Sequence, residues 1–228
     1  MMRSWESRHD TTVVDEPLYA AWMVATGAQH PMREAILQHH ESRWEQVVAQ
    51  LQGPVGTPIL YEKHISKHLC AHMDRAWLAS HRHAFLIRDP WPMLLSFQRK
   101  VEQVTVAETG LPQQAELWHW LHENLGIDAP VIDARDLLTD PSAMLPKMTA
   151  ALGVPFDPAM LQWEAGRRPT DGVWASHWYD AVEQSTGFRA YTPSTGALSR
   201  ELEAVHDACL PAYQFLHARR LRPVPSIC

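Results

Sequence analysis

Short apolar runs alternate along this chain with longer stretches in which apolar residues recur at every third or fourth position. The short runs have the length and the composition of β-strands, and turn-forming residues follow several of them. The predicted strands span residues 11–14, 59–61, 85–87 and 131–133.

The longer stretches predict helices, because their apolar residues fall on one helical face. Pro90, Pro112 and Pro141 suit the first positions of three of them, and Gly126 suits the end of one. Strands that alternate with helices of this length pair in parallel, with helices on both faces of a sheet. The pattern therefore predicts one α/β domain with a three-layer, mostly parallel sheet. The predicted helices cover residues 32–51, 65–78, 90–97, 112–126, 141–152, 177–184 and 198–216.

Composition narrows the class of protein. The chain has 228 residues, of which 46% are hydrophobic and 20% charged, and this suits a soluble protein with one large core. No run approaches the ~18 apolar residues of a membrane span, and residues 1–8 lack the apolar centre of a signal peptide. A net charge of −6 argues against general affinity for nucleic acid. The sequence predicts no particular oligomeric state.

The cysteines and histidines do not form a recognisable metal site. His64 and His68 have the spacing of a helical two-histidine site, but Ile65 stands where the zincin pattern requires a glutamate. We therefore expect no metal. An odd number of cysteines without metal-type spacing predicts free thiols and a cytoplasmic protein. The cysteines are Cys70, Cys209 and Cys228.

Residues 84–100 carry the most informative pattern. Asp89 suits the cap of a helix that starts at Pro90, so Arg88 is placed at the carboxyl end of the preceding strand. Open α/β sheets bind ligands at that edge. Ser96 follows about two helical turns later, and an arginine with a hydroxyl at such an edge fits a phosphate. A salt-bridged arginine and a surface serine are the alternative interpretation.

With three further segments, the Arg88–Ser96 pattern resembles the 3′-phosphate-binding motif of sulfotransferases that use 3′-phosphoadenosine 5′-phosphosulfate. The resemblance spans roughly residues 1–190 and implies the P-loop nucleotide-kinase-like fold of that family. The other segments are residues 14–19, the pair Lys63-His64, and residues 131–137 with Asp140-Pro141 and Leu152-Gly153.

The resemblance implies an enzyme that transfers a sulfuryl group from this donor to a hydroxyl of a small-molecule or carbohydrate acceptor. Arg88 and Ser96 would bind the 3′-phosphate of the donor, which is a co-substrate. Arg189 falls where the family brings a C-terminal loop onto the nucleotide, although the Arg-Lys-Gly triplet of the family is not present there.

The catalytic base stays open at this point. Lys63 is the candidate for neutralising charge near the sulfuryl group, and His64 is a candidate base because a histidine titrates near neutral pH. The cytosolic enzymes separate this Lys and His by one residue, whereas they are adjacent here, so His68 is a possible substitute. Glu16 is the competing base, since carbohydrate-acting relatives use a glutamate in a comparable region. An ordinary turn residue is the other interpretation of Glu16.

One departure from the family concerns the loop that holds the 5′-phosphosulfate. Bacterial relatives tend to carry it as Pro-Arg-Ser-x-Ser-Thr after a first strand, whereas residues 2–8 look like the helix that follows this loop. We expect residues 1–228 to form a single sulfotransferase-like domain that is N-terminally incomplete. The alternatives are a catalytically inactive family member that acts as a binding domain and, less favoured without a Gly-x-x-x-x-Gly-Lys-Ser/Thr loop, a P-loop phosphotransferase.

Overall fold

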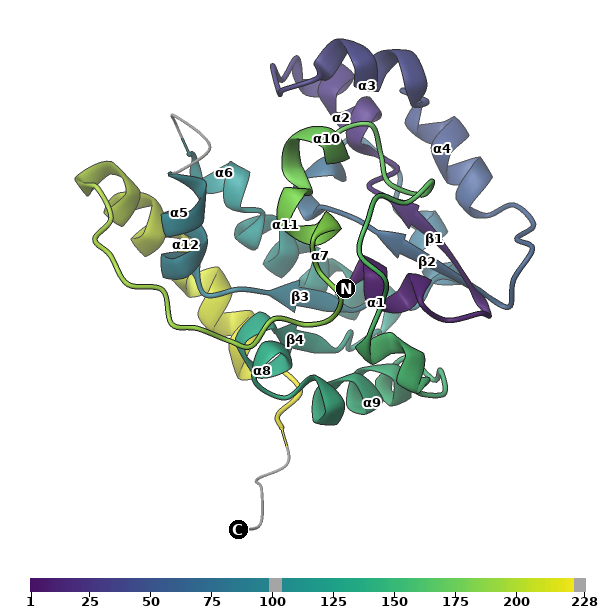
Figure 1. Ribbon diagram of the computed structural model, residues 1–228. Coiled ribbons are helices and arrows are strands. Elements are labelled where there is room, and N and C mark those ends of the chain that lie inside the picture. The colour runs from purple at the N-terminus through teal and green to yellow at the C-terminus, as the bar shows by residue number, and fades with distance from the viewer. Residues whose placement is uncertain (99–103, 224–228) are drawn as a thin grey trace. The chain divides into compact units, whose positions relative to one another are not determined.

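The computed structural model of the protein describes residues 1–98 and 104–223 (Figure 1). The described chain folds into two compact units, and each unit contains one parallel pair of strands. The first unit combines residues 1–80 with residues 157–188, and the second combines residues 81–156 with the chain from residue 189 onward.

The first unit is built on the parallel pair of β1 (Thr11–Asp15) and β2 (Ile59–Lys63). The register runs from Thr11 opposite Ile59 to Asp15 opposite Lys63, so both strands end at the same edge. Around the pair lie helices α1 (Met2–Glu6), α2 (Tyr19–Thr26), α3 (Arg33–His39), α4 (Trp44–Leu51), α10 (Ala175–Trp178) and α11 (Asp180–Glu183), and 3₁₀ turns η1 (Ser66–His68), η2 (Ala76–Ser80) and η3 (Pro158–Leu161).

The core of the first unit forms around Trp174, which is 1% exposed and packs with Tyr19, Met23 and Ile36 of α2 and α3. A Cβ atom at Gly172 would meet the Trp174 ring, so only glycine fits two residues before it. Trp174 is therefore a core residue of this unit. Burial of a side chain of this size stabilises the unit by about 2–3 kcal/mol relative to exposure.

The second unit is built on the parallel pair of β3 (Phe85–Ile87) and β4 (Val131–Asp133), with Ile87 opposite Asp133. The Asp89 carboxylate accepts a hydrogen bond from the Trp91 N–H at 2.8 Å and caps α5 as the sequence predicts. The helices of this unit are α5 (Pro90–Phe97), α6 (Val106–Thr109), α7 (Leu111–Leu125), α8 (Ala134–Thr139), α9 (Pro141–Ala151) and α12 (Arg200–Ala218).

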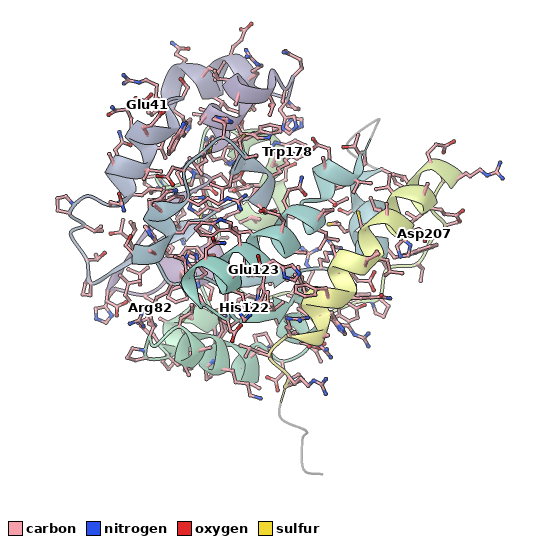
Figure 2. All side chains as sticks on the ribbon, turned by 180° about the vertical axis from the view of Figure 1, so that it is seen from behind. Glu41, Arg82, His122, Glu123, Trp178 and Asp207 are labelled. Atoms are coloured by element: carbon pink, nitrogen blue, oxygen red, sulfur yellow. The ribbon has the colours of Figure 1, made fainter. Side chains whose placement is uncertain are left out.

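The two longest helices of the second unit, α7 and α12, pack along each other, as Figure 2 shows from behind. The Phe215 ring of α12 meets the Trp118 ring of α7 edge-on, with 5.4 Å between ring centroids. Arg219 covers both rings, with its guanidinium carbon 4.9 Å from the centroid of Trp118 and 3.7 Å from that of Phe215. Leu94 and Leu95 of α5 pack with Leu198 and Leu202 at the start of α12.

The α/β class and the parallel pairing of strands are confirmed, and all four predicted strands form. In the described residues these strands make two pairs, β1–β2 and β3–β4. The prediction of a single, N-terminally incomplete domain stays a prediction.

Three predicted helices are wrong in extent. The helix predicted over 32–51 is divided into α3 and α4, because Glu41 accepts hydrogen bonds from the backbone and side chain of Arg43 while His40 is extended. Residues 65–78 form the 3₁₀ turns η1 and η2, and Asp74 starts the second by accepting the Ala76 N–H. Residues 177–184 contain α11 and the end of α10, with a break at Tyr179. Helices α2, α6 and α8 were not predicted.

Two further observations concern the expectations on thiols and membranes. Cys70 and Cys209 are free cysteines, and Cys228 lies outside the described residues. None of the helices in the described parts of the chain is both long and apolar enough to cross a bilayer.

Candidate functional site

The end of the β1–β2 pair in the first unit brings four polar side chains together. Because Asp15 and Lys63 are opposite each other in the register, their side chains meet at the carboxyl edge of the pair. The Lys63 ammonium donates to the Asp15 carboxylate at 3.0 Å, to Glu16 at 2.5 Å and to the Tyr179 hydroxyl at 2.5 Å. Tyr179 in turn donates its proton to Asp15 at 2.8–2.9 Å. We call these four residues the Lys63 cluster.

Burial controls the charges in the Lys63 cluster. The side chains of Asp15 and Glu16 are 1% and 11% exposed. Burial raises the pKa of Glu16 above its usual value; Lys63 partly offsets this effect and Asp15 adds to it. Burial alone would lower the pKa of Lys63, but the charges of Glu16 and Asp15 outweigh burial and raise it. Burial therefore favours the protonated form of Glu16, and Lys63 stays protonated.

Glu16 also has an unusual backbone. Its φ of 43° lies in the left-handed region, which costs a residue with a side chain about 1–3 kcal/mol. Two backbone hydrogen bonds hold it there: the Glu16 N–H donates to the Lys63 carbonyl at 2.8 Å, and the Glu16 carbonyl accepts the Tyr19 N–H at 3.0 Å. Strain of this kind concentrates at functional sites, and here it affects the candidate base.

The structure places His68, rather than His64, beside Glu16. His64 Nε2 donates a hydrogen bond to Glu62 Oε2 at 2.9 Å. The His68 ring is buried, stacks on Tyr19 with 4.5 Å between centroids, and holds Nδ1 3.9 Å from Glu16 Oε2. Its Nδ1 has no hydrogen-bond partner among the described residues. Burial lowers the pKa of His68 well below its usual value, so the ring is neutral at neutral pH.

The second unit holds Arg88 and Ser96 on the β3–α5 connection. Arg88 directly follows β3 and donates to the Pro92 carbonyl at 3.2 Å, and Ser96 lies exposed on α5. No acidic side chain forms a salt bridge with Arg88 within residues 1–98 and 104–223. Partial burial lowers the pKa of Arg88. An arginine without a paired carboxylate and an exposed hydroxyl on the following helix are the donors that an anion requires.

Arg189, the third predicted nucleotide contact, is exposed at the start of the second segment of this unit. The structure shows no ion pair for it within the described part of the chain. Its predicted contact with the nucleotide stays a prediction.

A cavity of about 380 Å³ lies elsewhere in the first unit, against α1. Arg3 lines this cavity and forms a bidentate ion pair with Asp171, in which both nitrogen–oxygen distances are 2.7 Å. None of the residues that line this cavity belongs to the Lys63 cluster, so we do not place the chemistry there. Among the described residues, no set of three or more His, Cys, Asp and Glu side chains could hold a metal ion.

Sequence reasoning missed two members of the Lys63 cluster. Tyr179 is 116 residues from Lys63 in the chain and only the fold brings them together. Asp15 directly follows the strand predicted over residues 11–14, and its position parallel to the strand that ends in Lys63 is the signal that could have identified it.

Comparison with known proteins identifies the family. Residues 1–220 match the family described as the sulfotransferase domain. The chain therefore belongs to the sulfotransferase domain family, as the Arg88–Ser96 resemblance predicts. Two solved structures are similar in fold at low identity: the sulfotransferase domain from the curacin biosynthetic pathway and that of the Synechococcus PCC 7002 olefin synthase. Each is 16% identical over 84% of this chain, covering 77% and 74% of those chains, with TM-scores of 0.38 and 0.36.

Two curated relatives come from Arabidopsis thaliana. The branched-chain-amino-acid aminotransferase-like protein 2 is 34% identical over 217 residues, and protein 1 is 37% identical over 221 residues. These matches cover 95% and 96% of this chain but only 38% and 39% of the relatives. The chain thus spans less than two fifths of the length of the curated relatives that it matches.

Proposed function

We propose that the protein is a sulfotransferase that uses 3′-phosphoadenosine 5′-phosphosulfate and a hydroxyl acceptor. The main support for this proposal is the pair of donors at the β3–α5 connection, in a chain that belongs to the sulfotransferase domain family. The Arg88 guanidinium lies there without a carboxylate partner among the described residues. The hydroxyl of Ser96 is exposed on the capped helix that follows. The two donors suit the 3′-phosphate of the nucleotide.

Sulfuryl transfer does not require a covalent bond between the protein and the transferred group. In sulfuryl transfer, as in phosphoryl transfer, a bond to the leaving oxygen breaks while a bond to the acceptor oxygen forms in line with it. The protein has to position the two reactants and to take the proton of the acceptor hydroxyl. The donor supplies the sulfuryl group and leaves as adenosine 3′,5′-bisphosphate.

Within this proposal Glu16 is the base, and it takes the proton of the acceptor hydroxyl. Burial raises the pKa of this carboxylate, and a higher pKa makes a stronger proton acceptor. Lys63 holds the carboxylate at 2.5 Å and keeps the charge balanced as Glu16 gains the proton. His64, the other candidate base, forms a hydrogen bond with Glu62 at 2.9 Å.

An aminotransferase activity, which the names of the curated relatives suggest for those proteins, finds no support at Lys63. Imine formation requires a neutral amine, which burial or a neighbouring cation provides by lowering the pKa of a lysine. Two carboxylates raise the pKa of Lys63 instead. We also propose a small-molecule or carbohydrate acceptor, on the family alone, and a cytoplasmic location, which the free thiols of Cys70 and Cys209 support.

Thermal unfolding with adenosine 3′,5′-bisphosphate tests the proposed nucleotide site. A ligand that binds only the folded protein raises the midpoint, by an amount equivalent to about 2.7 kcal/mol at 100 times its Kd. We expect such a shift for the wild type and its loss in Arg88→Ala. Arg43→Ala is the matched control, since Arg43 pairs with Glu41 on the surface of the first unit. The absence of a shift in the wild type would rule out the proposed nucleotide site.

A further inference from the structure

The carboxyl edge of the β3–β4 pair holds a second arginine besides Arg88. Ile87 of β3 is opposite Asp133 of β4, so the residues that follow the two strands emerge side by side. Arg88 comes directly after β3, and Arg135 comes two residues after the end of β4, in the first turn of α8. Both arginines are exposed.

Tyr191 holds the Arg135 side chain at this edge. The guanidinium carbon of Arg135 lies 5.5 Å from the centroid of the Tyr191 ring, which is a cation–π contact. The backbone N–H of Tyr191 donates to the Leu138 carbonyl of α8 at 3.3 Å, and this bond fixes the ring beside the helix that carries Arg135. Tyr191 also contributes to the electrostatic environment of Arg88, so the ring lies near both guanidinium groups.

The carboxylates of this edge are bonded to other groups. Neither Arg88 nor Arg135 forms a salt bridge in the described segments, although the Asp89 carboxylate next to Arg88 still acts on its charge. The partners are the Trp91 N–H for Asp89, the Arg135 N–H and the Tyr213 hydroxyl for Asp133, and Arg220 for Asp136.

We propose that Arg135 is a second phosphate-binding residue, and that Arg88 and Arg135 together bind a phosphomonoester dianion. The proposal rests on the proposed function, in which this phosphomonoester is the 3′-phosphate of the nucleotide. Tyr191 is a positioning residue, since it holds the Arg135 guanidinium and does not itself contact the phosphate. The second cationic contact thus comes from α8 and not from Arg189.

A phosphomonoester is the ligand class that suits this arrangement. It carries a charge of about −1.5 to −2 at neutral pH and three terminal oxygens. Each guanidinium presents two parallel N–H donors to such oxygens, so two arginines can satisfy a dianion from two sides. A diester or a carboxylate has one charge and would leave one of the arginines without a partner.

Calorimetric titration with two nucleotides tests the proposal. Adenosine 3′,5′-bisphosphate carries the 3′-phosphate and adenosine 5′-monophosphate lacks it. We expect Arg135→Ala to lower the affinity for the bisphosphate about 10- to 100-fold, because the phosphate loses hydrogen bonds from a charged group. Affinity for the monophosphate should stay within about 2-fold, a change worth only ~0.4 kcal/mol. Arg135→Lys should keep part of the affinity, because a lysine keeps the charge but loses the planar fork.

Variants of neighbouring residues separate the roles. Tyr191→Leu should lower the affinity for the bisphosphate, but less than Arg135→Ala does. Tyr191→Phe should have the affinity of the wild type, because it keeps the ring that contacts Arg135. Arg189→Ala, on the same segment as Tyr191, should also bind as the wild type does.

Three results would overturn the proposal. If Arg88→Ala abolishes bisphosphate binding while Arg135→Ala leaves it unchanged, Arg135 is not in the site and the proposed function still stands. If Arg135→Ala weakens both nucleotides equally, the residue has a structural role only. If the wild type binds neither nucleotide, the proposed function and this inference fall together.

Discussion

At the scale of single residues, the Lys63 cluster is the most constrained part of the first unit. One ammonium forms ion pairs with two carboxylates, and the Asp15 side chain is 1% exposed. A buried carboxylate without its cation is costly, because its desolvation is no longer offset. The cluster should therefore be more sensitive to the loss of the cation than any ion pair on the surface.

Lys63→Met tests this expectation. It should lower the free energy of unfolding by about 3 kcal/mol, the usual cost of removing one partner from a buried ion pair. Urea unfolding at neutral pH measures the change. Arg43→Met is the matched control, because the Arg43–Glu41 pair lies at the surface and should contribute little to stability. Equal losses in the two variants would mean that the Lys63 cluster is not a buried ion pair.

His68 gives the first unit a dependence on acid pH. Because burial lowers the pKa of His68 in the folded state below the usual histidine value of about 6.5, the unfolded chain binds the proton more strongly. Stability from the neutral ring is therefore present above pH 6.5 and is lost as pH falls below that value, by up to about 1.4 kcal/mol per pH unit.

The slope of unfolding free energy against pH between 6.5 and 5 measures this contribution. His68→Gln should flatten the slope relative to the wild type. His9→Gln should keep it, since the His9 side chain is 92% exposed. A wild-type slope in His68→Gln would show that His68 does not titrate as its burial requires.

The positions of three candidate residues at strand ends were predictable from the sequence, while their roles stay predictions. Glu16, Lys63 and Arg88 each follow or end an apolar run, and strand pairing alone places Glu16 near Lys63. Tyr179 and His68 were not identifiable in this way. Tyr179 reaches the cluster from the break between α10 and α11, 116 residues away in the chain. His68 approaches Glu16 from a 3₁₀ turn where a regular helix was predicted.

At the scale of elements, local signals predicted the connections well. Asp89 and Asp140 cap α5 and α9, and Gly126 ends α7 with a φ of 65°. These features depend on neighbours within four residues, so the sequence contains all that determines them. The break between α3 and α4 is different. Its apolar pattern runs through residues 32–51, and the side chain of Glu41 stops the helix by bonding to Arg43.

Asp89→Ala tests the cap that separates Arg88 from the helix of Ser96. It should lower the free energy of unfolding by about 1 kcal/mol, because the Trp91 N–H loses its acceptor. Asp140→Ala removes the corresponding cap of α9 and should cost a similar amount. If affinity for adenosine 3′,5′-bisphosphate also falls in Asp89→Ala alone, the cap positions Arg88 as well as stabilising the helix. Unfolding by urea and calorimetric titration give the two readouts.

At the scale of the whole molecule, the alternation of strands and helices was sufficient to predict the α/β class and parallel pairing. It was not sufficient to predict that the described strands form two pairs, because strand order depends on contacts between segments distant in the chain. The family assignment rests on residues 1–220 as a whole, and the chain spans less than two fifths of its curated relatives. The nucleotide site is therefore proposed for this chain alone, and it does not describe the activity of the longer relatives.

The most direct test of that site is the crystal structure of the protein with adenosine 3′,5′-bisphosphate. We expect the 3′-phosphate oxygens about 3 Å from the Arg88 guanidinium and the Ser96 hydroxyl, at the carboxyl end of β3. A nucleotide bound elsewhere, or none bound at millimolar concentration, would contradict the assignment of this edge as the phosphate site of a sulfotransferase.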